Sequence, residues 1–101
     1  MGLKVQVDFL QGSTVRIRAY VYDDDDTLVT PTSVTIDIYD PDDTLTIDGA
    51  TMDPTATGTY DYFYNTDSDT ATGQWYGTVW VVDGSGETAK TSYGTFSFKV
   101  K

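Results

Sequence analysis

The stretch Thr72–Val82, TGQWYGTVWVV, decides the fold that this sequence predicts. It opens on a Thr-Gly turn signal and then alternates between two sets of side chains. One set is Trp75, Gly77, Val79 and Val81, and the other is Tyr76, Thr78, Trp80 and Val82. Period-two alternation of aromatic and β-branched residues predicts a β-strand. Because both sets are apolar, we expect this strand to lie in the interior of a sheet, with Trp75 buried and Trp80 exposed.

Shorter alternating segments precede and follow this strand, and polar turn signals separate them. We expect strands at residues 3–9, 15–22, 34–39, 45–47, 50–53, 60–64 and 96–100. Asp48-Gly49 is predicted to be a turn between two short strands, and residues 54–58 are predicted to form a loop. Since no segment has helical periodicity, the sequence predicts one all-β domain over residues 1–101. Seven or eight short antiparallel strands at this spacing indicate a β-sandwich.

The composition narrows the classes of function. The 101 residues carry a formal net charge of −10, and the chain contains neither cysteine nor histidine. Nucleic acids and anionic membrane surfaces require a basic footprint, so we expect neither as a partner, and no apolar run is long enough for membrane insertion. Without cysteine there is no disulfide or thiolate metal site, and without histidine the commonest general base is missing. We therefore expect no enzyme activity.

Several short motifs along the chain resemble a known family. They are Phe9-x-x-Gly12-x-Thr14-Val15-Arg16-Ile17-Arg18-Ala19, Val34-x-Ile36-x-Ile38-x-Asp40-Pro41, Gly58-x-Tyr60, Gly73-x-Trp75 and Phe96-x-Phe98-x-Val100. Their order resembles bacterial, archaeal and phage immunoglobulin-like modules, and is most similar to the second-type domain of macroglobulins. The resemblance implies an immunoglobulin-like sandwich that acts as a scaffold or contact module. The thioester motif of macroglobulins is missing, so no reactivity is implied.

Acidic residues gather in loops, and one group suggests a metal site. In an immunoglobulin topology the loop after the second strand lies at the same end as the last hairpin. This would bring Asp23 and Asp25 near Asp83 and Glu87. Carboxylates that converge from two loops suit Ca²⁺, which takes six to eight oxygen ligands. The alternative is a solvated loop, because the spacing matches no EF-hand; apart from this possible Ca²⁺ we expect no cofactor.

Aromatic residues indicate a contact surface. When the Val79 face of the central strand points inward, Tyr76 and Trp80 point outward, and Tyr39 points outward from the neighbouring third strand. Tyr39, Tyr76 and Trp80 are thus expected to share one face, with Tyr93 as a further candidate. The opposite sheet is expected to expose Arg16, Arg18, Tyr20, Tyr22, Asp61 and Phe63. Aromatic residues and arginine are enriched at binding hot spots. The alternative is that these tyrosines only cover the strands and pack across them.

These observations favour a structural or contact subunit of a larger assembly, whose partners are other protein subunits. The start of the chain, MGLKVQVDFLQG, alternates like a strand and has no apolar run of signal-peptide length. An accessory protein of a phage particle or a module of a cell-surface protein fits this pattern, so we expect a virion or cell-surface location. The alternative is a carbohydrate-binding module that stacks sugar rings on Tyr39 and Trp80.

Overall fold

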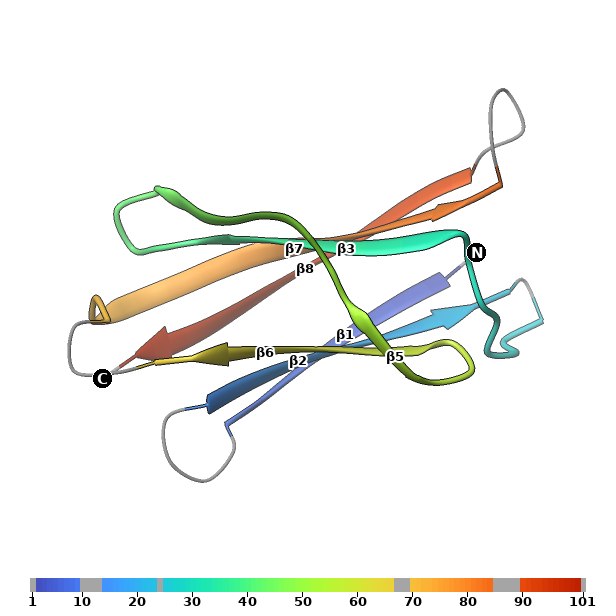
Figure 1. Ribbon diagram of the computed structural model, residues 1–101, viewed down its shortest axis with the longest axis horizontal. Coiled ribbons are helices and arrows are strands. Elements are labelled where there is room, and N and C mark those ends of the chain that lie inside the picture. Colours follow the sequence, from blue (N-terminus) through green and yellow to red (C-terminus); the bar gives the residue numbers. More distant parts are fainter. Residues whose placement is uncertain (1, 10–13, 24, 67–69, 85–89, 101) are drawn as a thin grey trace.

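The protein folds as a β-sandwich. A computed structural model describes residues 2–9, 14–23, 25–66, 70–84 and 90–100. Their eight strands are β1 (Gly2–Phe9), β2 (Thr14–Tyr22), β3 (Ser33–Tyr39), β4 (Leu45–Thr51), β5 (Asp53–Ala56), β6 (Thr59–Asn65), β7 (Gly73–Asp83) and β8 (Lys90–Val100). They form two antiparallel four-stranded sheets (Figure 1), which confirms the predicted fold class. The described residues include no helix with the length and apolarity needed to cross a membrane.

The strand order is that of an immunoglobulin-like sandwich. One sheet has the order β1-β2-β6-β5 and the other the order β4-β3-β7-β8. These correspond to the A-B-E-D and C′-C-F-G sheets of that architecture. Strand β7, the stretch from which the fold was predicted, pairs with both β3 and β8 and is therefore interior, as its two apolar faces predict.

The core consists of inward residues of both sheets, together with Met52 between β4 and β5. They are Val15, Ile17, Ala19, Val21, Val34, Ile36, Ile38, Met52, Tyr60, Trp75, Val79, Val81, Phe96 and Phe98. Trp75 is only 3% exposed, and its ring packs against those of Tyr64 and Phe98 at centroid distances of 5.4 and 6.0 Å. The indole Nε1 donates a hydrogen bond to the carbonyl of Ala71 at 2.9 Å, so burial leaves no polar atom of this side chain unpaired.

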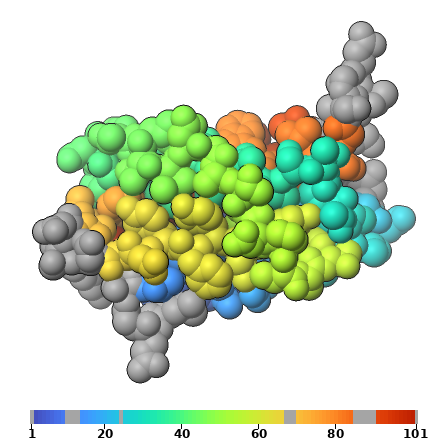
Figure 2. All heavy atoms as spheres, in the orientation of Figure 1, coloured from blue at the N-terminus to red at the C-terminus, as the bar shows by residue number. Residues whose placement is uncertain are grey.

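The chain crosses from one sheet to the other between β4 and β5. Met52 lies at the crossing, is buried, and donates its backbone N–H to the carbonyl of Val34 at 3.0 Å. Figure 1 shows this segment in front of both sheets, and in Figure 2 its side chains cover the same side of the molecule. One edge of the sandwich is thus closed by the chain itself.

Two predictions in this segment are wrong. Asp48-Gly49 does not separate two strands, because β4 continues through it as an irregular strand with register shifts against β3. Gly49 has φ +63°, and its N–H donates to Oδ1 of Asp37 at 2.7 Å, so a side chain on β3 holds the irregularity in place. Residues 54–58 are also not all loop, because β5 (Asp53–Ala56) pairs with β6 in spite of Pro54. An edge strand tolerates a proline because one of its sides needs no ladder donor.

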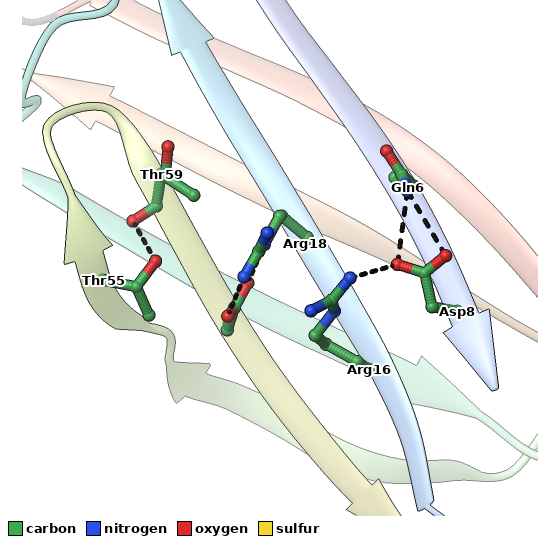
Figure 3. A network of polar contacts seen from close by, with 7 residues as sticks. Gln6, Asp8, Arg16, Arg18, Thr55 and Thr59 are labelled. Carbon is green, nitrogen blue, oxygen red and sulfur yellow. Dashed lines mark hydrogen bonds and ion pairs between the residues drawn. The ribbon is translucent and has the colours of Figure 1, made fainter. Parts of the chain in front are cut away.

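The outer face of the β1-β2-β6-β5 sheet carries a polar network (Figure 3). Arg18 donates from Nε and Nη2 to the two oxygens of Asp61 at 2.6 and 2.8 Å, and these bonds raise the pKa of the Arg18 guanidinium. Arg16 donates to Asp8 at 2.6 Å, and this bond lowers the pKa of the Asp8 carboxyl. Asp61 was predicted to be exposed but is only 2% exposed, because Arg18 covers it in the neighbouring strand.

Candidate functional site: an anchored aromatic face

Five apolar side chains lie on the outer face of the β4-β3-β7-β8 sheet, in two rows that cross the strands. One row contains Leu45, Tyr39 and Tyr76, which are register partners on β4, β3 and β7. The second row contains Trp80 of β7 and Tyr93 of β8. We call these five residues the aromatic face. It brings together the predicted Tyr39, Tyr76 and Trp80 and includes Tyr93, whereas Leu45 was not predicted.

Tyr39 and Tyr76 form a stacked pair at one end of the aromatic face. Their ring centroids are 5.1 Å apart and their planes differ by 7°. The hydroxyl of Tyr76 donates to Oδ1 of Asp43 at 2.6 Å. This bond to a carboxylate, together with partial burial, raises the pKa of Tyr76 to about 12. The phenol of Tyr76 is therefore held both by a neighbouring ring and by a turn at the end of β3.

Trp80 is held in a similar way at the other end. Its Nε1 donates to Oδ2 of Asp37 at 3.0 Å, and its ring packs on Tyr93 with a centroid distance of 5.3 Å and an angle of 38°. The other oxygen of Asp37 accepts the N–H of Gly49 in the irregular part of β4. Asp37 therefore couples the orientation of the indole to the shape of the adjacent strand, although sequence analysis gave this residue no role.

The aromatic face combines exposed apolar area with negative charge. The exposed fractions are 38% for Trp80, 37% for Tyr76, 40% for Leu45 and 65% for Tyr93. Strands β3, β4 and β7 contain no lysine or arginine, while Asp37 and Asp43 bond directly to the aromatic groups. The geometry thus presents fixed aromatic side chains beside two carboxylates, while Lys99 is exposed on the same face of β8.

A short repeat in the sequence explains how Asp43 comes to its position. Residues 22–28 read YDDDDTL and residues 39–45 read YDPDDTL, so the two segments differ only at Asp24 and Pro41. This repeat was not among the features predicted from the sequence. The match at six of seven positions, with each copy beginning on the last residue of an alternating strand, was the signal that could have revealed their common structure.

The described residues of the two segments make the same turn hydrogen bonds. Asp23 Oδ1 accepts the N–H groups of Asp25 and Thr27 at 2.8 and 3.0 Å, and Asp40 Oδ1 accepts the corresponding two groups at 2.9 Å each. The last aspartate of each turn has a left-handed backbone, with φ 61° at Asp26 and 64° at Asp43. Aspartate suits both positions, because its short carboxylate caps nearby amides and it tolerates this conformation.

Because the turns match, replacing the left-handed aspartate by glycine isolates the bond to Tyr76. We expect Asp26→Gly to leave the free energy of unfolding within about 0.5 kcal/mol, since relief of the left-handed strain offsets the greater entropy of the unfolded chain. Asp43→Gly undergoes the same exchange but loses the hydrogen bond from Tyr76, so we expect it to be less stable than Asp26→Gly by about 1 kcal/mol. Urea denaturation measures both; equal values would show that the Tyr76 bond contributes nothing.

The raised pKa of Tyr76 predicts a loss of stability in alkali. Its folded pKa of about 12 lies above the ordinary value of 10.0, so the neutral phenol is favoured in the folded state. The resulting stabilisation is complete below pH 10 and disappears as the pH rises through 12. We expect the urea midpoint of the wild type to fall more steeply over this range than that of Tyr76→Phe. Parallel curves for the two proteins would contradict the assignment.

The described residues give the predicted calcium site no support. Its end of the sandwich is formed as expected, because the N–H of Gly84 after β7 bonds Oγ1 of Thr32 before β3 at 2.9 Å. However, Oδ1 of Asp23 is occupied by the turn amides, and no three acidic residues among those described are grouped to hold a metal ion. Glu87 lies outside the described residues. A Ca²⁺ site built from Asp23, Asp25, Asp83 and Glu87 stays a prediction.

Comparisons with known proteins find no relative of this chain. No family model matches the chain, and no curated protein or solved structure matches it. The sandwich is therefore established by its strand order, while the resemblance to macroglobulin-type modules stays an interpretation of the sequence.

Proposed function

We propose that the protein is a non-enzymatic contact subunit of a larger protein assembly, such as a phage particle or a cell-surface structure, and that the aromatic face is its contact surface. The observation that carries this proposal is that Trp80 and Tyr76 are substantially exposed yet fixed by Asp37 and Asp43. Aromatic side chains that are oriented before binding lose little conformational entropy when a partner covers them.

The ring geometry favours a protein partner over a sugar. Parallel rings with centroids 5.1 Å apart must overlap, so Tyr39 and Tyr76 each cover part of one face of the other. A sugar ring needs an open aromatic plane on which to stack, and this pair offers little of one. Apolar side chains of a protein can instead pack against ring edges and against the neighbouring Leu45.

The charge of the face indicates the chemistry of the partner. Carboxylates bond to both Tyr76 and Trp80, no basic residue occurs in β3, β4 or β7, and the whole chain has a net charge of −10. Such a surface fits a partner patch that contains arginine or lysine, which also interacts favourably with the faces of aromatic rings. Binding should therefore weaken as the salt concentration rises.

The test is incorporation of purified variants into the native assembly of the source organism. We expect Trp80→Ala to bind at least about 30-fold more weakly than wild type, the loss typical of a hot-spot residue. Phe63→Ala is the matched control, because Phe63 is 47% exposed but lies on β6, in the opposite sheet. Equal incorporation of Trp80→Ala and wild type would overturn the proposal. Retention of the wild type, but not of Trp80→Ala, on insoluble polysaccharide would replace it with sugar binding.

A further inference from the structure

The four edge strands of the sandwich differ in how well they are protected against pairing with another chain. Strand β5 has four residues and contains a proline, and β4 is interrupted by register shifts. Strands β1 (Gly2–Phe9) and β8 (Lys90–Val100) both pair with their neighbours without a shift and include no proline, and β8 is the longer, with eleven residues against eight. Short, irregular or proline-containing edges resist edge-to-edge pairing, whereas a long regular edge invites it. Within the described part of the chain, β7 is the only strand that pairs with β8.

The side chains of β8 suit an additional antiparallel strand. Phe96 and Phe98 point into the core, and the alternate positions Thr91, Tyr93, Thr95, Ser97 and Lys99 are exposed. Threonine, serine and tyrosine form favourable cross-strand pairs on a sheet surface. On the inner side, Gly94 lies against Leu3 and Val5 of β1, so that face of β8 is already covered.

The local charge of β8, unlike that of the other edges, does not oppose pairing with a second copy of this chain. The protein has a net charge of −10, but no aspartate or glutamate occurs between Lys90 and Val100. The other edge strands carry Asp8, Asp48 and Asp53. Among the described strands, β8 is thus the one edge at which two copies meet without a carboxylate on either pairing strand.

We propose that two copies of the protein associate through antiparallel pairing of β8 with β8. Thr95 is the midpoint of the strand, so full overlap places Thr95 opposite Thr95 of the second copy and Lys99 opposite Thr91. The two Lys99 side chains then lie at opposite ends of the paired segment and do not meet. The result is a continuous eight-stranded sheet that carries both aromatic faces on the same side.

Two matched pairs of variants test this pairing in purified protein. We expect the wild type to dimerise between about 10 μM and 1 mM in sedimentation equilibrium, a weak association in keeping with a small interface. Thr95→Lys places like charges opposite each other and should weaken the dimer at least about fivefold. Thr46→Lys makes the same change at the β4 edge and should dimerise like wild type. Both variants reduce the net negative charge equally, so a difference in their dimerisation shows that β8 is the pairing edge.

Cysteine cross-linking tests the register, because the chain has no cysteine of its own. Thr95→Cys should form a disulfide-linked dimer on mild oxidation at least about tenfold faster than Thr46→Cys. Trp80→Ala should dimerise like wild type, which separates this proposal from the contact made by the aromatic face. A wild type that stays monomeric at 1 mM, or equal behaviour of the Thr95 and Thr46 variants, would overturn the proposal.

Discussion

Replacing Trp75 by alanine is expected to lower the free energy of unfolding by about 3–5 kcal/mol, the range for removal of a large buried aromatic side chain. Trp75 is 3% exposed and packs against Tyr64 of the opposite sheet and against Phe98 of β8, a neighbouring strand in its own sheet. Its loss leaves a cavity between the sheets, and the surrounding rings can fill that cavity only in part. Urea denaturation followed by circular dichroism measures the change.

Trp80→Ala is the control for this prediction, because Trp80 lies on the same strand but on its outer face. We expect it to cost on the order of 1 kcal/mol, since it removes a partly exposed ring and one hydrogen bond to Asp37. Trp75→Phe keeps most of the volume but loses the bond to the carbonyl of Ala71, so its cost should lie between the two. A larger effect at Trp80 than at Trp75 would mean that the faces of β7 are reversed.

The sequence was sufficient to predict the sandwich because alternation reports burial directly. In β7 the expected inward residues Trp75, Val79 and Val81 are buried, while Tyr76 and Trp80 are exposed. The same alternation on β3 put Tyr39 on the outer face next to Tyr76, which the register confirms. These positions follow from local chain geometry, in which successive side chains of a strand point to opposite faces.

Features that depend on contacts between distant segments were not predictable in the same way. Asp48-Gly49 has the composition of a turn, but the bond from Gly49 to Asp37 keeps it within a strand. Asp61 is a charged residue at an outward position, and only its pairing with Arg18 explains its burial. Propensity gives way to tertiary contacts at such places.

The aromatic face was predictable only in part. Period-two geometry placed its tyrosines and tryptophan together, but alternation does not reveal how an exposed side chain is held. The anchors are Asp37 and Asp43, one in the middle of β3 and one in a turn whose structure is shared with another part of the chain. The same carboxylates that raise the negative charge of the face also fix its aromatic groups.

Strand β7 contributes both to the core and to the aromatic face, and at Gly77 the backbone of β3 approaches it closely. An added Cβ at Gly77 would lie 2.2 Å from the backbone carbonyl oxygen of Asp37 and 2.5 Å from Cζ of Phe96. The side-chain position faces inward, as the partner of Phe96 on β8 and of Ile38 on β3. Glycine is thus required here by space, because the backbone of the adjacent strand approaches closely.

Gly77→Ala is therefore expected to lower the free energy of unfolding by about 3 kcal/mol or more, at the upper end of overpacking effects. The ring of Phe96 can turn away, but the carbonyl of Asp37 belongs to a central strand and can move only if the β3–β7 pairing is distorted. That distortion would also displace the side chain that anchors Trp80, so the indole fluorescence should change in the folded variant. Gly2→Ala is the control, because its nearest neighbour would be an ordinary contact at 3.8 Å, and we expect no loss there. If Gly77→Ala were as stable as Gly2→Ala, β3 and β7 could not lie as close together as this register requires.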